Sequence, residues 1–489
     1  MISAVPAAAA LEVVDGAREK GTKLIHFFTA RFSETGRDDA AALEVELMRR
    51  TREAGIRVIG PNCIGTMNLI DRVYCGFGAG FRNPNLKRGP VAFVSQSGGF
   101  AFSVVALADH EGLGFNYIVS AGNEADVTTL DLAADFLERD EVEVVVLYLE
   151  GVNDGRRLRE LGARALELGK PILTWKAGNT AVGRAAAESH TASMTAGYEL
   201  YRAAFREGGF IEISDVHDLV DIARAFLGRR LPRGPNIAII TTSGGSAVLM
   251  ADECDRRGLK LPRLSAATVT AIEQYAPQHC SLANPIDLTA QISGDNASFN
   301  KIVELTLNDP NIDQLIVRYG AVQGAAGAAW AGDLSAIAAK TGKPLLVSLG
   351  RVPDAAASAL QIFEKNGIPW MLTPTRTALA AGALHQFAEK QRRLRAAQAR
   401  AGLRVIAFQK LALPADTVRL SEHESKRCLA AYGIPIVREL ALAPEAVAAL
   451  SAAPLKFPLA VKIDSPDIPH KTEAGAVRLG ISDLAAMKE

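Results

Sequence analysis

The sequence predicts an α/β protein in which helices cover parallel sheets. Apolar runs rich in β-branched residues alternate with helical patterns along the chain, at 23–28, 91–94, 142–149, 237–240, 315–317 and 345–347. Strands separated by helices indicate parallel sheets, and their runs are continuously apolar because helices bury both faces. At 489 residues the chain is too long for one hydrophobic core, so several domains are expected.

A strand, a Ser-Gly-Gly turn and a helix occur twice, 146 residues apart. The run Val91–Gly99 is followed by a helical pattern to Gly112, and the run Ile237–Gly245 by one to Gly258. Strand, turn and helix-ending glycine all keep register. The repeat predicts two related doubly wound domains, residues 88–230 and 231–388.

The remaining segments lie at the two ends of this pair. Residues 1–87 start on a helix without a Gly-rich first turn. Residues 389–404 are rich in Arg, Gln and Ala, as in an exposed helix or connector, and the linker is expected to span 389–417. Ser421 and Glu424 form a capping-box pattern that starts a helix ending at Gly433, before a strand at Ile434–Ile436. Residues 418–489 therefore start a further domain, and both terminal domains are expected to be incomplete.

Composition excludes several classes of protein. Lys plus Arg and Asp plus Glu both number 54, so no overall charge favours nucleic acid or an anionic membrane. The five cysteines are too sparse for a disulfide framework, which fits a cytoplasmic protein. The alanine-rich stretch 4–10 has no basic segment before it and continues as an amphipathic helix, so we interpret it as neither signal peptide nor membrane span.

The two Ser-Gly-Gly turns are candidate anion sites. Ser97, Gly98 and Gly99 lie between a strand and a helix, as do Ser243, Gly244 and Gly245. Free N–H groups and the helix dipole favour an anion there, and glycine lets the anion approach the backbone. One such turn alone is also compatible with an ordinary strand-to-helix connection. Two copies in register favour a functional interpretation.

His190 lies in a hydroxyl-rich stretch, 188–194, that follows a glycine-containing loop and suggests an exposed turn. A neutral imidazole can attack a phosphoryl group if a carboxylate holds its other N–H. Glu150 is the natural partner because it follows the buried run 144–149 at the carboxyl edge, where doubly wound sheets place their sites. Considered singly, His190 could also be a histidine without a catalytic role, and Glu150 could be a solvated residue at the end of a strand.

Two further motifs stand after strands. Asn62 and Cys63 belong to 60–65, Gly-Pro-Asn-Cys-Ile-Gly, which is also compatible with a simple turn holding a buried, inert thiol. Lys462 lies on the strand 459–463 and His470 in the segment that follows. A strand lysine can neutralise nucleotide phosphates, although each residue alone would pass for a surface residue.

Together these motifs resemble the ADP-forming acyl-CoA synthetases, relatives of succinyl-CoA synthetase, over essentially the whole chain. Residues 60–65 match the family's signature late in its CoA-binding domain, and Ser33–Gly36 match the loop before it. Ser189–Thr191 match the phosphohistidine loop, and Val461–Ile463 with His470 match the opening of the ATP-grasp domain, apart from Ala476 in place of a second glycine. Asn284–Asp287 resemble another motif, whose role stays open.

The resemblance implies a fold and a set of roles. The fold is a partial Rossmann-like CoA-binding domain, two flavodoxin-like, succinyl-CoA synthetase-like domains and the start of an ATP-grasp domain. His190 would carry the phosphoryl group between the two Ser-Gly-Gly turns, and Glu150 would orient it. Asn62 and Cys63 would belong to the CoA and acyl region. Lys462 would contact nucleotide, and His470 would relay phosphate.

The implied activity is an acid-thiol ligase that forms acyl-CoA from a carboxylic acid, CoA and ATP, releasing ADP and phosphate. No metal ligand is expected within the chain, since the magnesium-binding carboxylates of the family would follow Glu489, and a homo-oligomer is expected. Two alternatives remain open: an ATP-dependent CoA lyase with the same activation chemistry, and a non-catalytic CoA-binding or regulatory relative. The acid and the nucleotide base are not disclosed by the sequence.

Overall fold

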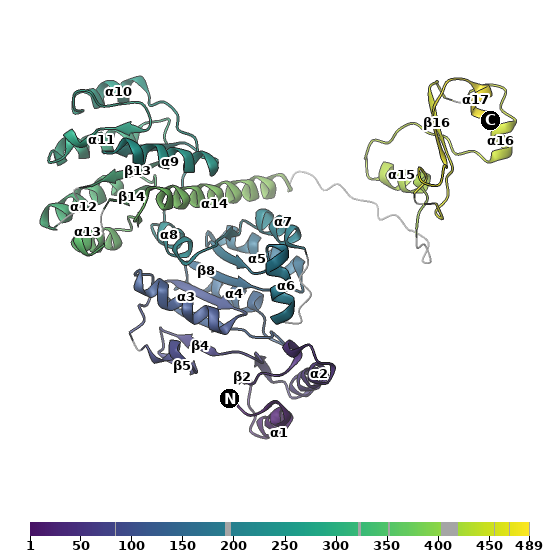
Figure 1. The fold of residues 1–489 in the computed structure, drawn as a ribbon, viewed down its shortest axis with the longest axis horizontal. Helices are drawn as coiled ribbons and strands as arrows, with labels where there is room; N and C mark the ends of the chain where they lie inside the picture. Colours follow the sequence, from purple (N-terminus) through teal and green to yellow (C-terminus); the bar gives the residue numbers. More distant parts are fainter. Residues whose placement is uncertain are drawn as a thin grey trace. The chain divides into compact units, whose positions relative to one another are not determined.

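The structure is a computed structural model that describes residues 1–489 except 84, 191–196, 321–323, 351–352, 402–418, 454, 469 and 489. For residues 187–190, 353–355, 400 and 401 only the backbone is described. The chain forms two compact units, Met1–Gln398 and Ala399–Glu489, which are considered separately. Figure 1 shows strands lying between helices throughout the first unit.

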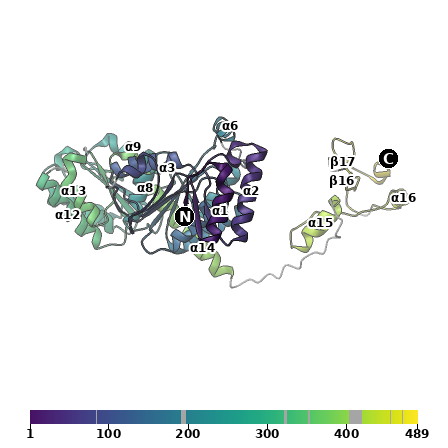
Figure 2. The same ribbon diagram turned by 90° about the horizontal axis from the view of Figure 1, so that it is seen from below.

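The first unit begins with a small three-stranded parallel sheet in the order β1-β2-β3. Its elements are β1 (Ile2–Ser3), η1 (Ala7–Ala9), α1 (Ala10–Glu19), β2 (Leu24–Phe27), η2 (Ser33–Thr35), α2 (Asp38–Glu53) and β3 (Arg57–Ile59). The predicted amphipathic N-terminal helix is α1, which buries Val14 while Arg18 lies near its end. Helices α1 and α2 lie side by side (Figure 2), joined by an Arg50–Asp15 ion pair of 2.9 Å.

The second sheet has seven strands in the order β10-β9-β8-β6-β7-β4-β5. Its elements are β4 (Gly65–Asn68), β5 (Val73–Gly76), η3 (Ala79–Arg82), β6 (Val91–Ser95), α3 (Gly98–His110), β7 (Tyr117–Ser120), α4 (Thr129–Glu138), β8 (Val144–Leu149), α5 (Gly155–Leu168), β9 (Ile172–Lys176), α6 (Ala181–His190), α7 (Tyr198–Gly208), β10 (Ile211–Glu212) and α8 (Val216–Leu227). The strands from β6 onward pair in parallel, whereas β4 and β5 add antiparallel strands at one edge. These two strands precede residue 88, where the sequence places the start of this domain.

The third sheet has five parallel strands in the order β12-β11-β13-β14-β15. Its elements are β11 (Ile237–Thr241), α9 (Gly244–Arg256), α10 (Ala266–Glu273), β12 (Ile286–Asp287), η4 (Ala290–Ile292), α11 (Asn296–Asn308), β13 (Gln314–Tyr319), α12 (Gly324–Ala339), β14 (Leu345–Leu349), α13 (Pro353–Lys365), β15 (Trp370–Met371) and α14 (Pro374–Ala401). This order equals that of β7-β6-β8-β9-β10, the flavodoxin-like arrangement in which the first strand lies between the second and the third. The predicted pair of related doubly wound domains is confirmed.

The two doubly wound domains share one hydrophobic core. Buried side chains of β6 and α3 belong to the same cluster as those of β11 and α9, and Phe226 of α8 packs edge-on against Phe387 of α14 at 5.3 Å between ring centres. The long helix α14 therefore closes the second domain and also packs against the first. Residues 389–401, predicted as an exposed helix or connector, continue this helix.

The second unit contains α15 (Glu422–Ala431), α16 (Pro444–Ala448), β16 (Leu459–Lys462), β17 (Val477–Ile481) and α17 (Leu484–Lys488), with β16 and β17 antiparallel. The predicted capping box is present, since the Ser421 hydroxyl accepts from the Glu424 N–H and the Glu424 carboxylate accepts from the Ser421 N–H. The predicted strand at Ile434–Ile436 is wrong, because these described residues form no strand. Pro435 lacks the N–H that a strand ladder needs.

Candidate functional site

Both Ser-Gly-Gly turns join a central strand to the helix that follows it. Ser97 and Ser243 occupy the N-cap positions of α3 and α9, yet among the described contacts neither side chain caps its helix. Instead, the carbonyl of each serine accepts a hydrogen bond from the hydroxyl two residues earlier, Ser95 at 2.6 Å and Thr241 at 3.2 Å. Because a serine N-cap usually satisfies one free N–H, both first turns keep N–H groups available for an anion.

The glycines of the two turns have different surroundings. A Cβ on Gly98 would lie 2.6 Å from Ile64, and one on Gly244 would lie 3.0 Å from the Asp287 carboxylate. A Cβ on Gly99 or Gly245, in contrast, would meet no described atom within 4 Å. Packing explains the first glycine of each pair and leaves the second unexplained. Close approach of a ligand to the backbone is a physical reason for the second.

Glu150 lies where the sequence places it, directly after β8 at the carboxyl edge of the sheet. Its peptide is held by Gln96, whose side-chain oxygen accepts hydrogen bonds from the N–H groups of Glu150 and Gly151. The Glu150 charge acts with burial to raise the pKa of Tyr148 to about 12, with burial the larger cause. Glu150 itself is half-buried at the strand end.

His190 is the last residue of α6, so its backbone is helical, while 191–194 of the predicted turn lie outside the described residues. The alanines of the segment 181–187 favour this helix, because alanine has the highest helix propensity. The side chain of His190 lies outside the described residues.

Asn62 and Cys63 lie in a loop that contacts two other loops. Asn62, at φ 58°, donates to the Asn123 side-chain oxygen at 3.2 Å, and Asn123 donates to Glu34 of the Ser33–Gly36 loop at 2.6 Å. Cys63 is buried and donates to the Phe27 carbonyl at 3.1 Å, and burial raises the pKa of its thiol to about 12. This thiol is protonated at neutral pH, so its surroundings favour the inert role that the sequence left open.

Lys462 and His470 line one cavity of the second unit, of about 660 Å³. Its other lining residues are Arg419, Leu420, Glu422, Ser425, Ser465, Pro466, Ile468, Lys471, Thr472, Glu473 and Val477. The basic residues among them favour an anionic occupant.

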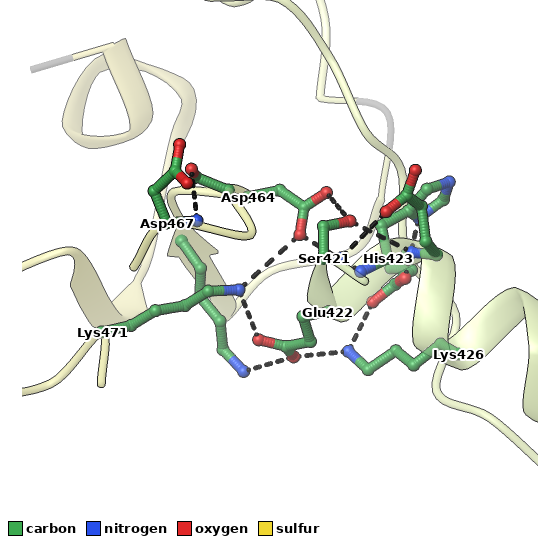
Figure 3. Close-up of polar contacts among 11 residues, drawn as sticks. Ser421, Glu422, His423, Lys426, Asp464, Asp467 and Lys471 are labelled. Atoms are coloured by element: carbon green, nitrogen blue, oxygen red, sulfur yellow. Dashed lines mark hydrogen bonds and ion pairs between the residues drawn. The ribbon is translucent and has the colours of Figure 1, made fainter. Parts of the chain in front are cut away.

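The Glu422 carboxylate, beside this cavity, accepts hydrogen bonds from three lysines. Glu422 accepts from Lys426 at 2.7 Å, from Lys471 at 2.8 Å and from Lys462 at 3.0 Å, and Figure 3 shows Lys426 and Lys471 reaching it from opposite sides. The hydrogen bonds from Lys426, then Lys471 and Lys462, hold the pKa of Glu422 far below its usual value. Lys426 also donates to Glu439 at 2.5 Å and Lys471 lies 3.7 Å from Asp464, so carboxylates balance much of the charge of these lysines.

Several residues of these sites were missed by the sequence analysis. Gln96, Lys176 and Glu422 each contact a candidate residue, and Lys426 contacts Glu422, yet none of the four belongs to a motif that indicated chemistry. A chain-order signal existed for Gln96, because it immediately precedes the first Ser-Gly-Gly turn. For the lysines only the fold brings the groups together.

Two kinds of feature are absent from the described residues. No group of three or more His, Cys, Asp or Glu side chains within that part of the chain is arranged to bind a metal ion. Among the described helices, none has the length and apolar character that crossing a membrane would require.

Comparison with known proteins identifies the domains. Residues 88–226 match the succinyl-CoA ligase like flavodoxin domain, residues 237–395 the ligase-CoA domain and residues 411–489 an ATP-grasp domain. The α subunit of ADP-forming acetate–CoA ligase II from Pyrococcus furiosus is 36% identical over 376 residues, covering 76% of this chain and 80% of the relative. ADP-forming acetate–CoA ligase I from Archaeoglobus fulgidus is 29% identical, covering 99% of this chain and 68% of the relative.

A solved structure agrees with these relatives. The dinucleotide-forming acetyl-coenzyme A synthetase 1 of Ca. Korarchaeum cryptofilum superposes with a TM-score of 0.72 at 30% identity, covering 81% of this chain and 84% of that one. The predicted resemblance and fold class are thereby confirmed. The chain belongs to the ADP-forming acetate–CoA ligase family, with succinyl-CoA ligase-like domains and an ATP-grasp domain.

Proposed function

We propose that this chain is an acid-thiol ligase that converts a carboxylic acid, CoA and ATP into acyl-CoA, ADP and phosphate through a phosphohistidine at His190. The observation that carries the proposal is the pair of uncapped Ser-Gly-Gly helix starts, in two domains of equal topology that share one core. The named activity of the Pyrococcus and Archaeoglobus relatives supports it. The Korarchaeum enzyme is also known in complex with phosphate and ADP.

The reaction runs in three reversible displacements. A ring nitrogen of His190 attacks the γ-phosphorus of ATP, the bond to the β-phosphate oxygen breaks and ADP leaves. A carboxylate oxygen of the acid then attacks this phosphorus and releases His190, giving an acyl phosphate. The CoA thiolate finally attacks the acyl carbon and phosphate leaves. No redox change occurs, so no other co-reactant is needed.

Each candidate residue has a role in this scheme. Residues 97–99 and 243–245 offer backbone N–H groups to the phosphoryl group on His190, which offsets its negative charge. Glu150 accepts the N–H of the ring nitrogen that does not react, which fixes the tautomer. Lys462 neutralises nucleotide phosphates, and His470 carries phosphate from the nucleotide. Asn62 lies at the CoA and acyl region, where Cys63 supports the loop.

The domain assignment that accompanies the scheme has five parts. Residues 1–87 provide part of the CoA-binding domain, 88–230 and 231–388 the two doubly wound domains, 389–417 the linker and 418–489 the ATP-grasp segment. Mg²⁺ enters with the nucleotide as part of the substrate. We expect a homo-oligomer, which light scattering would measure, and a cytoplasmic location, because all five cysteines, each of them described, are free thiols.

The proposal does not specify which carboxylic acid is the substrate. Relatives of this chain include a 4-hydroxybutyrate–CoA ligase and a trans-feruloyl-CoA synthase besides the acetate enzymes. These acids differ greatly in size, so product analysis with acetate, 4-hydroxybutyrate and ferulate would select among them. The same assay would detect cleavage of the acyl chain, which a lyase would give.

Replacing His190 tests the proposal directly. Wild-type protein incubated with acetyl-CoA and labelled phosphate should acquire acid-labile label on His190, and His190→Asn should lose it completely. Loss should be total because asparagine has no nucleophilic ring nitrogen. The buried His385 provides the control, since His385→Asn should retain the label. Label that persists in His190→Asn would show that another residue carries the phosphoryl group.

A further inference from the structure

The Glu150 peptide is fixed by side chains on both of its sides. On one side the Gln96 oxygen accepts from the N–H groups of Glu150 and Gly151, while its nitrogen donates to the Gly151 carbonyl at 2.8 Å and to Glu124 at 2.9 Å. Two donors face one end of the amide and two acceptors face the other. This pattern permits a single orientation of the Gln96 amide.

On the other side, Lys176 at the end of β9 donates to the Glu150 carbonyl at 2.8 Å and to the Ala177 carbonyl at 2.5 Å. Its ammonium also lies 4.6 Å from the centre of the Tyr201 ring. The Tyr201 hydroxyl in turn accepts from the Val152 N–H at 2.9 Å. Residues 150–152 are thus held by side chains from three separate elements.

These contacts limit what Lys176 can do. An ammonium group has three N–H donors; two of them face carbonyls, and the cation lies over an aromatic ring. The side chain is only 8% exposed. Lys176 therefore acts on Glu150, through hydrogen bonds to its peptide and through the attraction between the two charges, and an effect on the reaction has to pass through Glu150.

The second doubly wound domain shows what the fold itself requires at these positions. Strand register shows that Lys176 corresponds to Leu349 of the second domain. Lys176 of β9 pairs with Leu149 of β8, and Leu349 of β14 pairs with Tyr319 at the same position of β13. The same register aligns Glu150 with Gly320, and the repeat aligns Gln96 with Thr242. The acid and the two side chains that hold its peptide are all replaced in the sister domain.

Leu349 is 1% exposed, so a leucine fits the end of this strand in the same topology. A lysine there must lose most of its hydration, and burial accordingly lowers the pKa of Lys176 to about 8, although the Glu150 charge opposes this shift. A buried cation that the fold does not need indicates a requirement of the site.

We propose that Lys176, with Gln96, is a positioning residue that holds the Glu150 peptide so that the Glu150 carboxylate can orient His190. The inference rests on the proposed function, because it assumes that Glu150 acts on His190. It adds two residues to the phosphoryl-transfer site and assigns their action to a named peptide. A positioning effect of this kind changes the rate of phosphohistidine formation and leaves substrate binding intact.

The test uses the full chain and the residue that the sister domain supplies. Lys176→Leu should lower the rate of His190 labelling from acetyl-CoA and labelled phosphate by about tenfold or more, with the KM for acetyl-CoA unchanged. In a Glu150→Ala background the same substitution should have no further effect, because its route of action has been removed. Gln96→Thr should behave like Lys176→Leu in both backgrounds.

Lys170 provides a matched control, because it also donates to two main-chain carbonyls, those of Leu137 and Arg139, at the opposite end of β9. Lys170→Leu should label at the wild-type rate. If Lys176→Leu does not fold, Gln96→Thr provides the same comparison from the other side of the peptide. Wild-type labelling by Lys176→Leu, or an equal loss in the Glu150→Ala background, would overturn the inference. Absence of label on wild-type His190 with acetyl-CoA, 4-hydroxybutyryl-CoA and feruloyl-CoA alike would instead overturn the proposed function.

Discussion

At the scale of single residues, Lys176 illustrates a conflict between stability and function. Its ammonium is buried at the end of β9, where the sister domain carries Leu349. Burying a charge costs free energy that hydrogen bonds to two carbonyls offset only in part. Active sites commonly retain such residues at the expense of stability.

Replacing Lys176 should therefore stabilise the protein at neutral pH. We expect Lys176→Leu to raise the free energy of unfolding by about 1 kcal/mol at pH 7, because the gain from removing a buried charge exceeds the loss of two hydrogen bonds. Urea unfolding followed by tryptophan fluorescence would measure this change. A loss of several kcal/mol would show instead that the lysine is needed for folding.

The same comparison has a defined pH dependence. The folded pKa of Lys176, about 8, lies below the ordinary value of 10.5, so above pH 8 the unfolded chain binds this proton more strongly than the folded protein. Wild-type stability should rise relative to Lys176→Leu by about 2 kcal/mol between pH 8 and 9.5. The charges that act on this lysine are those of Glu150 and Arg184. A constant difference across this range would contradict the lowered pKa.

Sequence reasoning could predict Glu150 but not the residues that hold it. Glu150 ends an apolar run, and a carboxylate at the end of a buried strand is visible in one sequence. Lys176 also ends an apolar run, yet it reads as a solvated strand end, because nothing local indicates that its ammonium faces two carbonyls and a ring. Strand register across two domains is needed to see that leucine takes its place elsewhere.

At the scale of elements, the first turns of α3 and α9 follow one rule in both domains. The first glycine packs tightly against a neighbouring side chain, and the second lies in open space. Helix propensity alone would favour alanine at the second position. That both domains retain glycine there is consistent with an anion that must reach the backbone.

Two alanine substitutions in α3 should separate packing from ligand approach. Gly98→Ala should lower the free energy of unfolding by about 1–3 kcal/mol, because its methyl group would overlap Ile64. Gly99→Ala should leave stability within about 1 kcal/mol of wild type, since helix starts tolerate alanine. Thermal unfolding of the two variants would measure these changes.

The rate of His190 labelling should not follow the order of stability of these variants. Gly99→Ala should slow His190 labelling by about tenfold or more, because a methyl group beside the free N–H groups would keep the phosphoryl group away from them. An exposed glycine in another helix, Gly155→Ala on α5, is the control and should label normally, since its Cβ also meets no described atom within 4 Å. Normal labelling by Gly99→Ala would remove Gly99 from the anion site.

The elements differ in how far sequence could predict them. The strands of the two doubly wound domains were predictable, because a buried parallel strand leaves an unbroken apolar run. The strand expected at Ile434–Ile436 was wrong. A short apolar run does not show whether a neighbouring strand is available to pair with it, and Pro435 has no N–H to donate to such a strand. The helix that contains His190 was missed because its hydroxyl-rich end outweighed the alanines before it.

At the scale of the whole first unit, two domains have to be held in one arrangement if their helix starts are to serve a single phosphoryl group. Their shared apolar core helps to hold the two domains together, and a buried ion pair between them favours one relative orientation. Arg376, at the start of α14, forms a two-point contact with Asp221 of α8 and also donates to Glu111 at 3.1 Å. Asp221 is fully buried, so these contacts are desolvated.

Removing Arg376 should therefore loosen the joint between the two domains. Arg376→Met leaves the Asp221 carboxylate buried without its main partner, and breaking a buried pair in this way costs about 3–5 kcal/mol. Arg224, 3.5 Å from the same carboxylate, should limit the loss to the lower end of that range. Urea unfolding would measure the loss, and His190 labelling below the transition should fall with it, because the two turns would no longer be fixed relative to each other.

The exposed pair Arg37–Asp39 is the matched control, since both of its side chains are about 70% exposed. Arg37→Met should leave the free energy of unfolding at the wild-type value, because water already screens this pair. Replacing Asp221 and Arg376 together, by Leu and Met, removes both charges of the pair and should restore part of the stability lost in Arg376→Met, because Arg224 then loses its carboxylate partner. If labelling recovers with stability, the ion pair acts by holding the domains together. If stability returns while labelling stays low, the geometry that the charges impose is itself required, because an apolar contact can join the domains without fixing their angle.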